Sequence, residues 1–147
     1  KDFSVIIDFA HTPNAFEQLL SCLRQQTKGR IIHVFGSAGE RDRKKRPVMG
    51  KISSNYVDII ILTAEDSRKE DVNKIIEEIE SGISNNKVEV AKIPDRSEAI
   101  KTAVGMAKAS DLVLVTGKGH EKSMTFGKKD TPWDEYEAVK TALDTRI

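Results

Sequence analysis

The sequence predicts an α/β fold, in which a mostly parallel sheet is covered by helices on both faces. Short apolar segments alternate along the chain with amphipathic segments of about 10–14 residues, which is the usual order of strands and helices in such a sheet. Several short segments are apolar at consecutive positions, as expected for strands that are buried on both faces. Polar turns, two of them containing pairs of glycines, follow these segments.

The first strand is expected at residues 3–9, as a buried strand, and the first helix at residues 13–26. Thr12 and Pro13 mark the start of this helix, because threonine caps free backbone N–H groups and proline has none to lose in the first turn. Apolar side chains recur on one helix face, and Gly29 ends the segment.

A second strand is expected at residues 30–35, where His33 is interpreted as a structural histidine rather than a ligand. The segment 36–47 follows, with two glycines and then a run of basic side chains. Such a run is usually a solvated loop, but its place after a strand favours the binding of a carboxylate or phosphate by an arginine. A short helix is expected at residues 48–54.

The third strand is expected at residues 57–63 and is followed by an amphipathic helix at 72–83. Apolar and polar residues alternate over 88–93, which predicts a more exposed strand. Asp95 or Ser97 is then expected to cap a further helix.

The last part of the chain contains a strand at residues 111–115 that leads directly into Gly117-Lys-Gly-His-Glu121. A small hairpin at 124–130 and a final helix at 134–144 complete the prediction. We therefore expect a three-layer, Rossmann-like domain with about six strands, formed by residues 1–147 as a single domain.

Composition excludes several classes of function. The 24 Lys and Arg residues nearly balance the 23 Asp and Glu residues, so net charge gives no indication of nucleic acid or membrane binding. No apolar run reaches the ~18 residues of a membrane span, and no signal peptide is recognised. The single cysteine, Cys22, excludes an internal disulfide and a multi-thiolate metal site; we interpret it as a core residue and expect a reducing, cytoplasmic setting.

Four polar clusters follow predicted strands, at residues 8–14, 36–46, 65–68 and 117–121. Parallel strands joined by right-handed crossovers end at the same edge of the sheet, where ligands of such folds bind. We therefore expect the clusters to meet there and to bind a polar ligand with more than one charge.

Five segments carry a resemblance to a known family, and they cover nearly the whole chain. They are Asp8-Phe-Ala-His-Thr-Pro-Asn14, Phe35-Gly-Ser-Ala-Gly-Glu-Arg41 with the basic run to Gly50, Thr63-Ala-Glu-Asp-Ser-Arg68, Asp95-Arg-Ser-Glu-Ala-Ile100 and Gly117-Lys-Gly-His-Glu121. In order and spacing they resemble the carboxy-terminal domain of the Mur ligases, especially members that form a UDP-N-acetylmuramoyl-tripeptide.

The resemblance implies one part of a three-domain enzyme that joins an amino acid to a peptide carboxylate through an acyl-phosphate. ATP and Mg²⁺ would be bound mainly by a central domain, because this chain lacks the P-loop and the carbamylated lysine of the family. The partners implied are ATP, a UDP-N-acetylmuramoyl-dipeptide and a diamino acid, with no nucleic acid or membrane. No catalytic residue and no metal ligand is assigned here, and the domain is expected to be inactive alone.

The resemblance also implies roles for individual residues. Nucleotide-binding residues would be Asp8, toward the ribose, and His11 and Asn14 beside it. The residues that would bind the amino-acid substrate are Arg41, Glu65, Asp66, Arg68, Gly117 and Glu121. The roles of Lys118 and His120 are left open.

The added amino acid is either meso-diaminopimelate or L-lysine. Arg68 favours the distal carboxylate of diaminopimelate, whereas Asp66, where many diaminopimelate-adding members have asparagine, would suit an ammonium group. Two alternative functions are kept: a domain of a ligase similar to folylpolyglutamate synthetase, and a nucleotide-binding module without catalytic activity.

Overall fold

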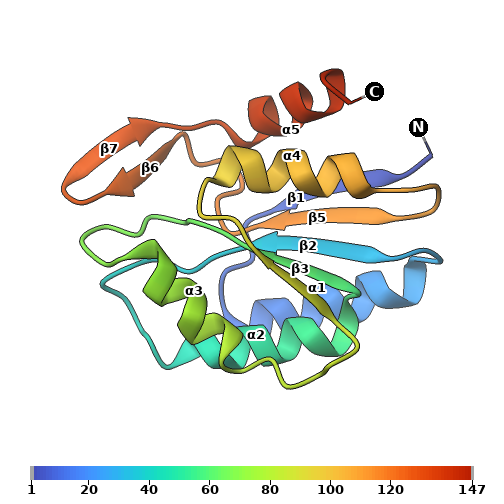
Figure 1. Ribbon diagram of the computed structural model, residues 1–147, viewed down its shortest axis with the longest axis horizontal. Helices are drawn as coiled ribbons and strands as arrows, with labels where there is room; N and C mark the ends of the chain where they lie inside the picture. The colour runs from blue at the N-terminus through green and yellow to red at the C-terminus, as the bar shows by residue number, and fades with distance from the viewer. Residues whose placement is uncertain (1, 147) are drawn as a thin grey trace.

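The computed structural model describes residues 2–146 and confirms the α/β class (Figure 1). Within these residues five strands form one parallel sheet in the order β1-β5-β2-β3-β4. The strands are β1 (Ser4–Asp8), β2 (Ile31–Phe35), β3 (Ile59–Leu62), β4 (Glu89–Lys92) and β5 (Leu112–Thr116). The sheet has five strands rather than about six, because β6 (Ser123–Phe126) and β7 (Lys129–Pro132) form a separate antiparallel hairpin.

Helices cover both faces of the sheet. On one face lie α1 (Pro13–Gln26), α2 (Lys45–Tyr56) and α3 (Val72–Glu80); on the other lie α4 (Arg96–Met106) and α5 (Glu135–Asp144) (Figure 1). Alternate residues of the central strands therefore enter two separate apolar cores. Full burial of one leucine or phenylalanine side chain contributes about 1.5–3 kcal/mol, so these cores hold the layers together.

Both predicted helix caps near the carboxyl edge are present. The Thr12 hydroxyl accepts a hydrogen bond from the Ala15 amide at 3.2 Å. The Asp95 carboxylate, rather than Ser97, caps α4 by accepting from the Glu98 amide at 3.1 Å. These caps fix where the chain leaves the sheet edge and enters each helix.

His33 is a structural residue, as predicted. Its ring is fully buried, with Nδ1 2.8 Å from the Ser53 hydroxyl and Nε2 2.9 Å from the Thr116 hydroxyl. Burial, and to a smaller extent the positive charge of Arg96, lower the pKa of His33 to about 3. The ring is therefore neutral at physiological pH.

Three local expectations were wrong. Strand β1 is an edge strand whose residues are half-exposed or exposed, because it pairs with β5 alone. Cys22 is exposed: Phe16 and Leu20 form the buried face of α1, and a residue two positions further lies on another side of the helix. Helix α2 begins at Lys45 instead of Val48, because proline at position 47 is tolerated in a first helical turn.

No helix within residues 2–146 is long and apolar enough to cross a membrane.

Candidate functional site

The four polar clusters meet at the carboxyl edge of the sheet, as the strand order requires. They surround a cavity of about 320 Å³, here named the carboxyl-edge cavity. All six residues predicted to bind the amino acid line it: Arg41, Glu65, Asp66, Arg68, Gly117 and Glu121. Phe9, His11 and Lys45 also contribute to its wall.

A second hollow, named the α1 groove, lies at the start of α1 and has a volume of about 560 Å³. Asp8 and His11, predicted to bind nucleotide, both line it, and Phe9 and His11 lie between it and the carboxyl-edge cavity because they line both. Asn14 lines neither hollow; it is exposed in the first turn of α1.

Asp8 and His11 are held by the backbone of their own turn. The Asp8 carboxylate accepts the Ala10 amide hydrogen at 2.8 Å through Oδ2. His11 Nδ1 lies 2.9 Å from the Phe9 carbonyl oxygen, which can only accept, so Nδ1 carries the hydrogen and Nε2 is left to contact a ligand. The turn therefore presents one carboxylate and one imidazole nitrogen at the helix start.

The loops after β2 and β3 lie directly against each other. Gly39 donates its amide hydrogen to the Asp66 carbonyl at 2.8 Å, and a Cβ atom on Gly39 would overlap the carbonyl of Ser67. The hairpin holds the second loop from the other side, since Arg68 donates its amide hydrogen to the Thr125 carbonyl at 3.1 Å. Asp66 and Arg68 both have positive φ angles, of 30° and 53°, in this loop.

Lys118 has a structural role that the sequence left open. Its side chain is 1% exposed, and Nζ lies 3.0 Å from each carboxylate oxygen of Asp66 and 3.0 Å from Oε1 of Glu121. Asp66 also accepts the Thr125 amide hydrogen at 2.8 Å. The charge of Asp66 is therefore already compensated within the protein. His120 is exposed, with its ring 5.7 Å from that of Phe9.

The basic run after β2 divides into paired and unpaired arginines. Arg46 is fully buried, 2.8 Å from a Glu70 oxygen and 3.1 Å from a Glu78 oxygen, and its hydrogen bonds lower the pKa of Glu70 to about 2. Arg41 and Arg68 have no carboxylate partner within residues 2–146: Arg41 Nη1 donates to the Glu40 carbonyl at 3.2 Å and Arg68 Nη1 to the Gly39 carbonyl at 2.8 Å.

Glu65 is buried beside the cavity, and its Oε1 has no hydrogen-bond partner among the described residues. Gly117 lies against it with φ of 111°, and a Cβ atom at this glycine would overlap Oε1. Burial raises the pKa of Glu65, against the opposing positive charges of Arg96 and Lys45. The cavity thus combines two arginines without a carboxylate partner, and Lys45, whose Nζ donates to the His11 carbonyl at 3.0 Å, with a carboxyl oxygen that lacks a hydrogen-bond partner.

Within the described part of the chain, no three His, Cys, Asp or Glu side chains are grouped so that they could hold a metal ion. The α1 groove offers a carboxylate beside a helix N-terminus, which is suited to a ribose next to phosphates.

The family is decided by comparison with known proteins. A family model described as "Mur ligase, glutamate ligase domain" matches residues 1–119. This chain belongs to the Mur ligase family. A UDP-N-acetylmuramyl-tripeptide synthetase from Roseiflexus sp. (strain RS-1) is 47% identical over 145 residues, which are 96% of this chain and 28% of that relative.

Solved structures agree with membership of the Mur ligases. The structure of a UDP-N-acetylmuramoyl-L-alanyl-D-glutamate–2,6-diaminopimelate ligase superimposes with a TM-score of 0.93 at 34% identity and covers 98% of this chain and 30% of that chain. E. coli FolC in complex with ADP is less similar, with a TM-score of 0.59 at 27% identity over 77% of this chain and 25% of that chain. The resemblance inferred from the motifs is therefore confirmed. The chain spans 28% of the length of the Roseiflexus relative.

Sequence reasoning gave no role to Arg46 or Arg96 and left that of Lys118 open, and all three are buried and paired with carboxylates in this Mur ligase domain. Lys118 and Arg46 are paired with carboxylates from other loops, and Arg96 is paired with Glu135. Arg96 lies in one of the family motifs, which was the available signal. Nothing local distinguished Arg46 from the arginines beside it.

Proposed function

We propose that this chain is the amino-acid-binding and ATP-site-completing domain of an ATP-dependent ligase. The ligase adds meso-diaminopimelate to UDP-N-acetylmuramoyl-L-alanyl-D-glutamate in peptidoglycan synthesis, in the cytoplasm. One observation carries the proposal: Arg41 and Arg68 line the same cavity, and neither has a carboxylate partner within residues 2–146.

Two unpaired guanidinium groups suit a ligand with two carboxylates, because each can bind one carboxylate through two parallel hydrogen bonds. Diaminopimelate has two carboxylates and lysine has one, so lysine would form this ion pair with only one of the two arginines. Asp66, the residue that favoured lysine, is already neutralised by Lys118 at 3.0 Å. Glu65, and Glu121 through the oxygen that does not contact Lys118, are the proposed acceptors for the ammonium group at the far end of the side chain.

The α1 groove supports the second half of the proposal. Asp8 would accept hydrogen bonds from the ribose hydroxyls, while His11 would flank the ribose and phosphates at the start of α1. Most contacts to ATP and Mg²⁺ belong to segments outside this chain. ATP supplies the energy to activate the dipeptide carboxylate as an acyl-phosphate, and the task of this chain is to hold the attacking amine beside it.

The substrate is tested by steady-state kinetics of the full-length ligase with meso-diaminopimelate and L-lysine. We expect kcat/KM for diaminopimelate to exceed that for lysine by at least about 30-fold, which corresponds to about 2 kcal/mol for the loss of hydrogen bonds between a guanidinium and a ligand carboxylate. A preference for lysine would overturn the assignment of the amino acid. Activity with a folate acceptor would favour the ligase similar to folylpolyglutamate synthetase, and nucleotide binding without any ligation would favour the non-catalytic module.

A further inference from the structure

The family motif at residues 95–100 makes none of the proposed substrate contacts, yet its arginine is buried next to the carboxyl-edge cavity. Arg96, the first residue of α4, is 2% exposed. Its guanidinium Nη1 donates to the Ala64 carbonyl at 2.9 Å, and Nη2 donates to the Thr116 carbonyl at 2.8 Å. One side chain thus joins the ends of β3 and β5, which β2 separates in the sheet.

The two carbonyls directly precede residues of the cavity. Glu65 follows Ala64, and Gly117 follows Thr116. A shift of either carbonyl therefore moves the backbone of a residue that lines the cavity, at the point where Gly117 lies against the Glu65 carboxyl group.

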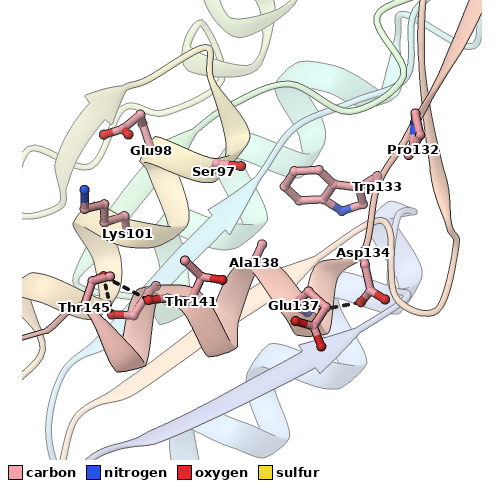
Figure 2. Close-up of a pocket in the computed structure, with 11 residues that line it drawn as sticks. Ser97, Glu98, Lys101, Pro132, Trp133, Asp134, Glu137, Ala138, Thr141 and Thr145 are labelled. Atoms are coloured by element: carbon pink, nitrogen blue, oxygen red, sulfur yellow. Dashed lines mark hydrogen bonds between the residues drawn. The ribbon is translucent and has the colours of Figure 1, made fainter.

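The guanidinium is fixed from its other side by the start of α5. Nε and Nη2 of Arg96 donate to the two oxygens of Glu135 at 3.0 and 2.7 Å, and both side chains of this pair are fully buried. Trp133 donates its indole hydrogen to Glu135 Oε1 at 3.0 Å. Figure 2 shows Trp133 between the start of α4, marked by Ser97, and the segment that leads into α5.

We propose that Arg96 is a positioning residue for the amino-acid substrate. By holding the carbonyls of Ala64 and Thr116 at a fixed separation, it keeps Glu65 and Gly117 in the arrangement that the diamino acid requires. Glu135 orients the guanidinium for this task. The inference rests on the proposed function, because it concerns the substrate of the same cavity.

The geometry demands arginine rather than any cation. Four hydrogen bonds leave the guanidinium of Arg96 in its plane and reach four oxygen atoms on three residues. Lysine has a single nitrogen with three donors and cannot span this distance between acceptors. Arg96→Lys therefore keeps the charge that faces Glu135 but releases at least one of the two carbonyls.

The test compares two arginines in the full-length ligase. Arg30 is the control: its Nε and Nη2 both donate to Oδ2 of Asp111, at 3.1 and 2.7 Å, at the opposite end of the sheet. We expect Arg96→Lys to raise the KM for meso-diaminopimelate roughly 10- to 100-fold, the size of effect that a misplacement of about 1 Å produces. The KM for ATP should stay within about twofold, and Arg30→Lys should change neither constant.

Fluorescence provides a readout of the Glu135 contact in the 147-residue chain itself. Trp133 is the single tryptophan of this sequence, so its emission reports the surroundings of Glu135. We expect Arg96→Lys to shift the emission maximum and Arg30→Lys to leave it unchanged.

The inference is overturned if Arg96→Lys has the diaminopimelate KM of the wild type, or if it raises the KM for ATP by the same factor. Should Arg96→Lys fail to fold, Glu135→Gln is measured in the same way; it keeps the shape of the pair, and a normal diaminopimelate KM would again overturn the inference. A wild-type ligase without activity on any diamino acid would instead refute the proposed function.

Discussion

The two ends of the parallel sheet treat charged side chains differently. At the amino end, Arg24 lies 2.9 Å from Asp58, and Arg30 lies 2.7 Å from the nearly buried Asp111. At the carboxyl end, Arg41 and Arg68 have no carboxylate partner within residues 2–146. Both ends are rich in charge, and what distinguishes the carboxyl end is that two arginines without a carboxylate partner line one cavity there.

The carboxyl end also contains paired charges, and these connect neighbouring loops to each other. Arg46 joins the loop after β2 to Glu70 and Glu78, and Lys118 joins the loop after β5 to Asp66. Buried pairs of this kind add little net stability but fix one arrangement of the groups they connect. The unpaired arginines are therefore presented from loops whose positions are already set.

The largest expected effect comes from removing an unpaired charge at the carboxyl end. Arg68→Ala should cost about 2–5 kcal/mol in diaminopimelate binding, the range for losing one partner of a desolvated pair. Isothermal titration calorimetry on the full-length ligase with nucleotide and UDP-sugar present measures this loss. Arg43→Ala is the control, because Arg43 carries the same charge in a neighbouring loop position but is paired with Glu78 and does not line the cavity.

Unchanged diaminopimelate affinity in Arg68→Ala would contradict the distinction between the two ends of the sheet. It would show that a guanidinium without a protein partner at this edge is not reserved for a ligand carboxylate.

At the amino end of the sheet, removal of a paired charge should change the free energy of unfolding and leave substrate binding unchanged. Asp111 accepts hydrogen bonds from the Arg30 side chain and amide and from the Lys108 amide, and Arg30 holds the pKa of Asp111 below its usual value. Asp111→Ala should lower the free energy of unfolding by about 1–3 kcal/mol, since these donors lose their acceptor. Urea unfolding measures the loss, and a large change in substrate KM would contradict the separation of the two ends.

The smallest expected effect comes from Glu65→Gln, which should raise the free energy of unfolding at pH 7 but weaken diaminopimelate binding. The pKa of Glu65 is raised above the usual 4.5, chiefly by burial, so the folded state holds this proton more tightly than the unfolded state and becomes relatively less stable as pH rises above 4.5. Glu65→Gln removes this dependence and should stabilise the chain at pH 7 by about 1 kcal/mol. It should also weaken diaminopimelate binding.

Urea unfolding of wild type and Glu65→Gln at several pH values provides the measurement. The stability difference should be smallest below pH 4.5 and should increase toward neutral pH. A difference that is independent of pH would show that Glu65 is not destabilised by its burial.

Much of the fold follows from local patterns in the sequence. Consecutive apolar residues predict the buried strand at 111–115, and Thr12 with Pro13 predicts the start of α1. The meeting of the four polar clusters is also predictable, because the carboxyl ends of parallel strands share one edge.

The pairing of the charges could not be predicted in the same way. Arg46 and Glu70 are 24 residues apart, Arg96 and Glu135 are 39 apart, and Lys118 and Asp66 are 52 apart. The residues around each arginine do not indicate its distant partner. The local sequence therefore does not distinguish Arg41 from Arg46, and the positions of the loops in the fold are needed. Only the fold separates the arginine that is free for a ligand from the one that is buried.

The central claim is that two unpaired arginines each bind one carboxylate of the same diamino acid. A crystal structure of the full-length ligase with meso-diaminopimelate tests it most directly. The account predicts one carboxylate on Arg41, the other on Arg68, and the distal ammonium near Glu65 and Glu121. A ligand whose carboxylates contact only one of these arginines, or one that lies outside the carboxyl-edge cavity, would contradict it.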